Sequence, residues 1–462
     1  NPANAACAMK LQDILTDAGK KVKAGTLSAA IVKVSGYENE THVYHANTLA
    51  SASDPQSYTY VIPEGVTLMG GYYEGTFNNG VYQNDGWDNA TGNNVRNPMK
   101  FQTVLSAVSE ANASTVQTVR GYHTVTFGAW PGTATLTKET VIDGLYLIDG
   151  SATSMAGAGN PNTRGGGAIV PSGAHVRNCV VTNCEAIEGG GLYLLPGATV
   201  SGTAVIECEA TNGAGIYADS TNVNKDSRAH ILSCTIANNE ASSTGGGIYM
   251  EDGAVMSVNT VIFDNRAGSD KNVSGVVSKQ FEDSKLATVF NITNKTSFYP
   301  FNNCFVETQE MPSDFENRML ESDESLYFAD DYYRLKDYSF LIKHGVKNEY
   351  QTALVTIFNV ATQDMQNIDR IQTGNAAERL DAGAFAYEGG ILPTDLFTRI
   401  FVSPTTNVTL PDGEDMGKYL GRSFYTSFST LEDALGYIRS MREGGKNADK
   451  EFEILVAGGT YK

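Results

Sequence analysis

The chain has 462 residues, which is long for one ordinary globular core and favours several domains or a repetitive, elongated fold. The chain contains 33 Lys and Arg and 52 Asp and Glu, and its net charge of −19 makes nucleic acids and anionic membranes poor partners. The 47 Gly, the 23 Tyr against only 2 Trp, and the charged fraction of 18% favour an all-β fold of strands and turns.

The start of the chain predicts a helix followed by a strand. The segment LQDILTDAGKKV (Leu11 to Val22) has the apolar spacing of a short amphipathic helix, and AIVKVSGY (Ala30 to Tyr37) alternates like a half-buried strand. The opening NPANAAC has neither an initiator Met nor a charged and then apolar leader, so we interpret the chain as mature or excised material. No apolar run reaches the roughly 18 residues of a membrane-spanning helix, and we expect no such span.

The loop YQNDGWDNATGNN (Tyr82 to Asn94) is a candidate calcium site. Its oxygen donors include Asp85 and Asp88, which could hold Ca²⁺. The loop lacks the Gly and Glu spacing of an EF-hand, and a turn-rich loop without metal explains the same composition more simply. Neither a CxxC pair nor a His-rich cluster suggests zinc. We therefore expect no cofactor, with Ca²⁺ at this loop as the alternative.

A repeat in the middle of the chain decides the predicted fold. Gly-rich triplets begin at Gly165, Gly189, Gly213 and Gly245, with offsets of 24, 24 and 32 residues; an insertion around Thr221 to Arg228 lengthens the last. Each unit continues with a short alternating strand, a small-residue turn and a second apolar strand, which is too little chain for a helix and crossover. Such units bury their apolar faces by stacking, with equivalent residues about 4.8 Å apart.

Stacking turns equivalent positions into columns. The predicted interior column is Val181, Val205, Ile236 and Ile262, and the predicted turn column is Cys184, Cys208, Asn239 and Asn265. We expect the Asn residues of the turn column to adopt the left-handed conformation and to bond the next rung. Cys179 and Cys234 share a column two rungs apart, at roughly 9 to 10 Å, which is beyond the reach of a disulfide. Cys184 and Cys208 are adjacent, so their pairing stays open.

The Gly-Gly-Gly-Ile-Tyr run and the strand CTIANNEA (Cys234 to Ala241) resemble the right-handed parallel β-helix repeat proteins of bacterial surfaces. These are the broad class of adhesin-like and polymorphic outer-membrane proteins. The resemblance implies a right-handed parallel β-helix, a solenoid on a Gram-negative surface or outside the cell. It also identifies earlier segments as coils: Val61 to Phe77, Thr103 to Leu105, Tyr122 to Phe127 and Thr140 to Ala152.

The last part of the chain resembles a closing segment followed by a new unit. Tyr333 to Val346 and Asp364 to Gly389 resemble the end of such helices, where an Asp-x-Gly-Ala-Tyr-Glu type strand closes the solenoid. The helix-like LEDALGYIRSM (Leu431 to Met441) and the strand FEILVAGGTYK repeat the order seen at the start of the chain. We therefore expect a β-helix domain over residues 1–395. Residues 396–462 are expected to contain a linker and the beginning of a second β-helix in a longer tandem chain.

Tyrosines that follow the Gly triplets are the predicted ligand-binding residues. Tyr193, Tyr217 and Tyr249 continue a column that starts at Ile169, and alternation assigns the interior to their neighbours Leu192, Ile216 and Ile248. If the rings face outward, they form a flat platform with hydroxyls at the rim, which suits a glycan or a cell-surface protein.

A column of carboxylates supports an alternative, catalytic function. Parallel β-helices also include polysaccharide lyases and glycoside hydrolases, which need clustered carboxylates with a basic residue alongside. The candidates are Glu185, Glu209, Glu240 and Arg266. This column follows from repeat copying, and a solvated face explains it equally well. We therefore expect a secreted or cell-surface adhesin-like protein that binds a glycan or a protein partner without catalysis, and keep the lyase or hydrolase as the alternative.

Overall fold

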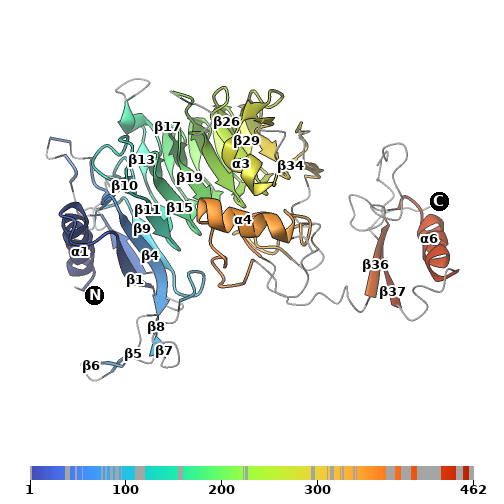
Figure 1. The fold of residues 1–462 in the computed structure, drawn as a ribbon, viewed down its shortest axis with the longest axis horizontal. Helices are drawn as coiled ribbons and strands as arrows, with labels where there is room; N and C mark the ends of the chain where they lie inside the picture. Colours follow the sequence, from blue (N-terminus) through green and yellow to red (C-terminus); the bar gives the residue numbers. More distant parts are fainter. Residues whose placement is uncertain are drawn as a thin grey trace.

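Short parallel strands, stacked from one coil of the chain to the next, form the body of the protein in the computed structural model (Figure 1). The structure describes residues 3–36, 42–46, 49–51, 53–54, 56–73, 76–78, 81–83, 87–88, 93–94, 96–109, 120–154, 160–221, 223, 227–292, 297–309, 311–312, 317–322, 324, 327–336, 339, 341–370, 380–386, 397–402, 428–443 and 451–456.

Four parallel sheets run along the stack. Sheet A has eight strands: β1 (Ala30–Gly36), β4 (Val66–Tyr73), β11 (Thr140–Asp143), β15 (Ala174–Arg177), β19 (Thr199–Ser201), β23 (Ala229–Leu232), β27 (Val255–Val258) and β33 (Phe301–Asn302). Sheet B has nine: β2 (His42–His45), β9 (Thr103–Ser106), β12 (Tyr146–Ile148), β16 (Val180–Thr182), β20 (Ala204–Ile206), β24 (Thr235–Ala237), β28 (Val261–Phe263), β34 (Phe305–Glu307) and β35 (Arg318–Leu320).

Two further sheets complete the coils. Sheet C has five strands: β13 (Ser151–Ala152), β17 (Glu185–Glu188), β21 (Glu209–Asn212), β25 (Glu240–Thr244) and β29 (Arg266–Ser269). Sheet D has seven: β3 (Tyr60–Ile62), β10 (Val125–Phe127), β14 (Ala168–Val170), β18 (Leu192–Leu194), β22 (Ile216–Ala218), β26 (Ile248–Met250) and β30 (Val273–Gly275). Each full coil visits sheets D, A, B and C in turn, which is the predicted parallel β-helix.

The predicted interior column is confirmed. Val181, Val205, Ile236 and Ile262 pair in register along sheet B, and all four side chains are fully buried. The column extends backward to Leu147 and Leu105 and forward to Val306. Because successive strands of sheets A, B and D place apolar side chains over those below, one continuous core runs through the coils.

Glycine permits the tight bend that precedes four strands of sheet D, β14, β18, β22 and β26. The first residue of each triplet has a positive φ, 70° at Gly189 for example, where other residues would be strained. In three of the four triplets the second residue is also Gly and lies against the next coil, since a Cβ on Gly190 would fall 2.2 Å from the carbonyl oxygen of Glu209. The Gly213 triplet has the buried Ala214 at this position. These contacts explain why the triplet recurs in the sequence.

The turn column is built differently from the prediction in one respect. The residues in the left-handed conformation are Asn183, Glu207, Asn238 and Asp264, each one position before the predicted column. Asn239 and Asn265 instead turn their side chains into the interior. The preceding residue supplies the bend, so the amides are free to bond between rungs: Asn239 Oδ1 accepts from Cys208 N at 3.0 Å, and Asn265 Oδ1 accepts from Asn239 N at 3.1 Å.

The five cysteines whose side chains the structure describes behave as small apolar residues. Cys179, Cys184, Cys208, Cys234 and Cys304 are buried and unpaired, so no disulfide joins Cys179 to Cys234, as predicted. Burial raises the pKa of the Cys179 and Cys234 thiols to about 12, which leaves them protonated and unreactive at neutral pH.

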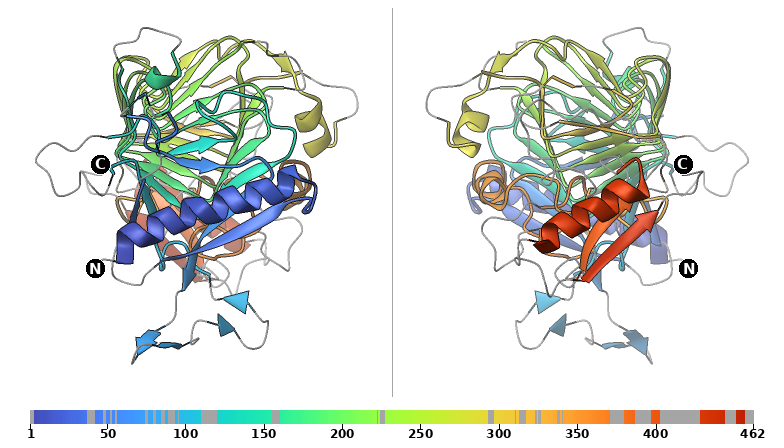
Figure 2. Two further views of the ribbon diagram at one scale, coloured as in Figure 1. Left: turned by 90° about the vertical axis from the view of Figure 1, so that its left-hand side faces the viewer. Right: turned by 90° about the vertical axis from the view of Figure 1, so that its right-hand side faces the viewer.

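Helix α1 (Ala3–Lys23) covers the first coil, as Figure 2 shows. Leu11, Leu15 and Val22 point into the core, and the Gln12 amide exchanges two hydrogen bonds with the backbone of Val61, each 3.0 Å long. The helix therefore covers apolar residues that the end of a solenoid would otherwise expose to water.

The segment after β35 differs from the predicted closing element. Its described residues lie beside the coils: Met99 N donates to Met365 O, Asn178 Nδ2 to Gln363 O, and Ala384 N to Thr235 Oγ1, at 2.8 to 3.0 Å. Residues 381–386 form no strand. The physical reason is that the outward side chains of sheet B are apolar and need cover, which Tyr327, Phe328 and Leu341 supply among others.

Two helices cover the outer face of sheet A. Helices α3 (Ser284–Val289) and α4 (Asn348–Phe358) pack Leu286, Leu354 and Phe358 with Leu232 and Met256 of that sheet. A short 3₁₀ helix, Pro161–Thr163, precedes β14. Antiparallel pairs are β5 (Thr76–Asn78) with β6 (Val81–Gln83), β7 (Trp87–Asp88) with β8 (Asn93–Asn94), and β31 (Phe281–Glu282) with β32 (Ser297–Phe298).

The C-terminal residues form the predicted helix and strand. Helix α6 (Leu431–Glu443) packs Ala434 and Ile438 against β36 (Phe397–Val402), which pairs in parallel with β37 (Glu451–Val456). The division near residue 395 falls outside the described residues, and the second β-helix stays a prediction. None of the described helices combines the length and apolar character that a membrane span requires.

Candidate functional site

The tyrosine column faces outward, as its sequence neighbours indicate. Tyr193, Tyr217 and Tyr249 pair in register along sheet D, while Leu192, Ile216 and Ile248 lie in the core. The rings stack with centroids 5.0 Å apart between Tyr193 and Tyr217 and 4.8 Å apart between Tyr217 and Tyr249. The predicted ladder of stacked phenol rings is present.

The column is not the open platform that we expected. Tyr193 has 0% exposed surface and Tyr217 has 7%. The Arg164 guanidinium lies 4.5 Å from the Tyr193 ring centroid, and the Tyr193 hydroxyl donates to Asp219 Oδ2 at 2.8 Å. Burial raises the pKa of both phenols above the usual range. A ligand could reach only Tyr249 without displacing this cover, so ligand binding by the column stays a prediction for that ring.

The hydroxyl of Tyr217 is also occupied. It donates to Glu251 Oε1 at 2.9 Å, and Glu251 Oε2 accepts from the backbone and the hydroxyl of Ser220 at 2.8 Å each. These bonds tie the chain that follows β22 to the coil above it. Asp219 and Glu251 are each the sixth residue after the first Gly of their triplets, Gly213 and Gly245, so they occupy equivalent repeat positions. The sequence pattern alone did not show that these carboxylates bond the tyrosine hydroxyls of the preceding coil.

The carboxylate column forms on sheet C, where Glu185, Glu209, Glu240 and Arg266 pair in register. Glu209, Glu240 and Arg266 are exposed, and Glu185 accepts from Arg120 Nη1 at 3.0 Å and from Ser151 Oγ at 2.6 Å. The first carboxylate is thus neutralised by an arginine, and the others face solvent. This arrangement has the properties of a hydrated surface and gathers no acid and base about a groove.

The candidate calcium residues cannot be placed. Asp85 lies outside the described residues, and Asp88 belongs to β7 but its side chain is not among those described. Among the described side chains, no group of three or more His, Cys, Asp or Glu is arranged to hold a metal ion. Calcium at this loop therefore stays a prediction.

A serine, a histidine and a carboxylate meet on the outer face of sheet A. His175 Nε2 lies 2.8 Å from Ser201 Oγ, and His175 Nδ1 lies 4.0 Å from Glu139 Oε1. This order of groups is that of a nucleophile, its base and the orienting acid. Ser201, however, has 0% exposed surface, so no substrate reaches its oxygen. Burial lowers the pKa of His175, so its contact with Ser201 is a neutral, buried one, whereas the Glu139 side chain is 56% exposed and ionised.

An open cleft lies outside sheet B, between the chain before β9 and the turn at residues 330–334. Its volume is about 470 Å³, within the range of about 300 to 1,000 Å³ in which proteins hold small ligands. The lining residues combine amides, carboxylates, cations and a tyrosine: Asn97, Met99, Lys100, Gln102, Asp330, Asp331, Tyr332, Arg334 and Gln366. This cleft is the candidate functional site.

Hydrogen bonds fix the two walls of the cleft to each other. Asn97 Nδ2 donates to Gln366 O and Met99 N to Met365 O, both at 3.0 Å. On the other wall, Arg334 Nη1 donates to Gln366 Oε1 at 3.2 Å. Because Gln366 joins both walls, the cleft is formed before a ligand arrives, and binding costs little rearrangement.

Asp330 holds the turn that presents Tyr332. Its Oδ1 accepts from the backbone N–H of Tyr332 and of Arg334 at 3.2 Å, and its Oδ2 accepts from Arg334 Nε at 2.5 Å. The Tyr332 ring packs edge-on against Tyr146, with centroids 6.1 Å apart, and Tyr332 is half-buried. The tyrosine is therefore held in place with part of its ring open to the cleft.

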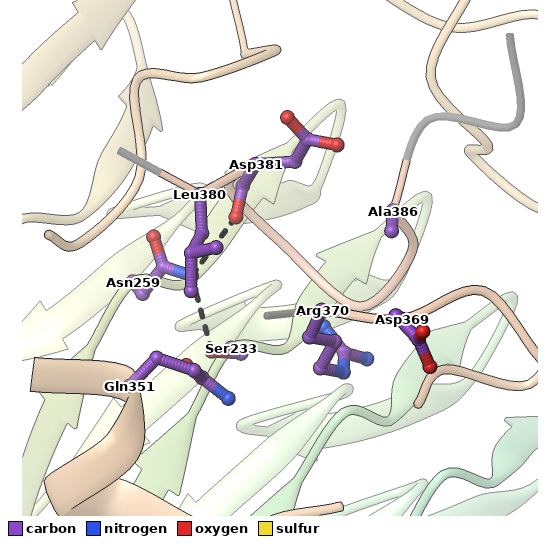
Figure 3. Close-up of a pocket in the computed structure, with 8 residues that line it drawn as sticks. All are labelled: Ser233, Asn259, Gln351, Asp369, Arg370, Leu380, Asp381 and Ala386. Atoms are coloured by element: carbon purple, nitrogen blue, oxygen red, sulfur yellow. Dashed lines mark hydrogen bonds between the residues drawn. The ribbon is translucent and has the colours of Figure 1, made fainter. Parts of the chain in front are cut away.

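A second, enclosed pocket lies between α4 and the coils, and Figure 3 shows its lining. Ser233 and Asn259 come from the coils, Gln351 from α4, and Arg370 and Asp381 from the segment outside them. Its volume is only about 10 Å³, roughly that of one water molecule. The pocket is thus part of the packing that attaches the segment, and it is too small for an organic ligand.

Sequence reasoning missed the cleft, since its residues come from segments far apart in the chain that carry no recognisable motif. The one available signal was the run Asp-Asp-Tyr-Tyr-Arg at residues 330–334, a polar and aromatic turn that overlaps the start of the segment from Tyr333 to Val346 predicted to close the helix.

The comparisons with known proteins assign this chain to no family. No protein-family model matches it, and neither the curated proteins nor the solved structures contain a match. The likeness to bacterial-surface β-helix proteins therefore rests on the repeat motifs and on the parallel β-helix that they form.

Proposed function

We propose that this protein is a secreted or cell-surface adhesin-like β-helix that binds a glycan, without cleaving it, in the cleft lined by Lys100 and Tyr332. The observation that carries the proposal is the cleft itself: an open, preformed volume of about 470 Å³ with amide and carboxylate groups beside an accessible tyrosine. Amides and carboxylates bond sugar hydroxyls, and an aromatic ring packs against the apolar face of a pyranose.

The charge state of the cleft favours binding over catalysis. A glycosidase needs two carboxylates with separate roles, one protonated and one ionised. Asp330 is held by Arg334 and two backbone N–H groups, so only Asp331 is left for chemistry. A lyase needs a base beside an acidic sugar, and the net charge of −19 opposes a polyanionic substrate. The Gram-negative surface location belongs to the same proposal.

Glycan-array binding of the wild type, Tyr332→Ala and Tyr249→Ala tests the proposal. We expect Tyr332→Ala to weaken binding by at least ~10-fold, about 1.4 kcal/mol, because the ring is part of the cleft wall. Tyr249→Ala, a matched change at the half-buried end of the tyrosine column, should leave binding unchanged. Loss of binding only in Tyr249→Ala would contradict the cleft and support the column.

The catalytic alternative and the protein-partner alternative have separate readouts. Incubation with pectins and other uronate polymers plus Ca²⁺, followed at the ultraviolet absorbance of unsaturated sugars, should show no product, and clear product formation would refute the binding proposal. An array without any glycan bound, in a protein whose circular dichroism shows the intact fold, would refute glycan binding and leave a protein partner as the alternative.

A further inference from the structure

We infer that the cleft selects a neutral glycan, whose hydroxyl groups bind to Asp331, and discriminates against acidic sugars. The inference rests on the proposed function, because it names the ligand class of the same site. Its basis is the way in which charges are already paired inside the cleft.

The arginine of the cleft is occupied. Arg334 Nε donates to Asp330 Oδ2 at 2.5 Å, and Nη1 donates to Gln366 Oε1 at 3.2 Å. The guanidinium is therefore part of the wall and its charge is matched by Asp330. A ligand carboxylate would have to compete with both partners, so the usual bidentate recognition of an acidic group by arginine is blocked here.

Asp331 is the opposite case. It is exposed on the cleft wall, and within the described residues its side chain makes no hydrogen bond or ion pair. An ionised carboxylate accepts hydrogen bonds at both oxygens and donates none. Adjacent sugar hydroxyls are donors and satisfy these oxygens, whereas a ligand carboxylate, sulfate or phosphate offers only further acceptors and negative charge.

Lys100 does not reverse this balance. Lys100 is exposed, and its Nζ lies 5.4 Å from the ring centroid of Phe101. With Arg334 it supplies two positive charges to the cleft lining, against the two negative charges of Asp330 and Asp331. The cleft is therefore close to neutral. The field of the whole chain, with its net charge of −19, then works against an anionic ligand as it approaches.

Amide groups complete the selection for a neutral ligand. Gln102 lines the cleft as a half-buried side chain, and an amide both donates to and accepts from hydroxyl groups. A neutral sugar presents hydroxyls that match an amide and a carboxylate at the same time. The geometry thus points to hydroxyl recognition as the source of specificity.

The experiment compares matched neutral and carboxylated oligosaccharides, such as a galactan fragment and the corresponding galacturonate fragment, by isothermal titration calorimetry. We expect the wild type to bind the neutral form at least ~10-fold more tightly. Asp331→Asn should weaken binding of the neutral form and remove most of the discrimination. Asp13→Asn, the same charge change at an exposed site on α1, should leave both unchanged, which separates local recognition from net charge.

Each outcome bears on a different claim. Equal or tighter binding of the carboxylated form by the wild type would overturn the neutral-glycan inference while leaving glycan binding intact. Discrimination that persists in Asp331→Asn would overturn the role of Asp331. Failure of both oligosaccharide classes, together with an empty glycan array, would refute the proposed function itself.

Discussion

Replacing Asn265 by Ala tests the asparagine ladder inside the coils. The Asn265 side chain is buried and makes four hydrogen bonds: Oδ1 accepts from the backbone and side-chain nitrogens of Asn239 at 3.1 and 2.9 Å, and Nδ2 donates to Ile236 O and Asn272 Oδ1 at 2.9 and 3.0 Å. Truncation leaves these partners buried without a bond. At about 1 kcal/mol for each lost bond, the free energy of unfolding should fall by about 3 to 5 kcal/mol.

Urea denaturation followed by far-ultraviolet circular dichroism measures this loss. With a slope of about 3 kcal/mol per molar urea, the midpoint should move down by about 1 M or more. The control is Asn291→Gly, which removes an exposed amide at a residue whose φ of 52° a glycine adopts without strain, and should change stability by less than about 0.5 kcal/mol. A loss below about 1 kcal/mol in Asn265→Ala would refute the ladder, because an amide facing solvent costs little to remove.

Three further outcomes are expected. Burial lowers the pKa of His123 to about 4, so the folded protein binds fewer protons than the unfolded chain between pH 6.5 and 4. As the pH is lowered through this window, the urea midpoint of the wild type should therefore fall. A fall of equal size in His123→Gln would contradict the assignment. Gly190→Ala should destabilise the coils, because its Cβ would meet the backbone of the next coil. The control is Gly436→Ala in α6, where a Cβ would have nothing within 4 Å, and it should stabilise that helix by about 0.5 to 1 kcal/mol. Thermal melts that show the reverse order would refute the stacking. In a Cys7→Ser variant, native protein at pH 8 should not react with a thiol reagent that labels the denatured protein. The reason is that Cys179, Cys184, Cys208, Cys234 and Cys304 are all buried. Rapid labelling of the native state would refute this.

The coils could be predicted from the repeat because the residues within one repeat unit specify one turn of the chain. Each unit contains a Gly triplet, an alternating strand and an apolar strand. Because the units are alike, each folds in the same way and stacks in register on the previous one. Val205 and Ile236 could therefore be assigned to one column from spacing alone, and the structure pairs them directly. The same reasoning placed Glu209 over Glu240 and Tyr217 beside Tyr249.

Periodicity assigns a face to a side chain and does not say what covers that face. Tyr193 points outward as its alternation requires, yet Arg164 and Asp219 bury it completely. Similarly, the run that includes Asp381 resembles a closing strand, but the structure places it beside the coils, where its backbone bonds to their side chains. The cover of Tyr193 comes from neighbouring coils, and Asp381 accepts a hydrogen bond from Asn259, 122 residues earlier in the chain. Alternation along a single strand encodes neither contact.

The sequence by itself thus determined the coil, its interior columns and its N-terminal helix, because the hydrophobic effect and the strand register act on residues within one repeat of each other. Only the tertiary structure decided where a ligand could bind. The cleft forms when Asn97 bonds to Gln366, 269 residues later in the chain, and brings Lys100 opposite Tyr332. The placement of Lys100 and Tyr332 in one cleft follows from how the last segment covers the apolar outer face of sheet B. A pattern within one repeat does not determine it.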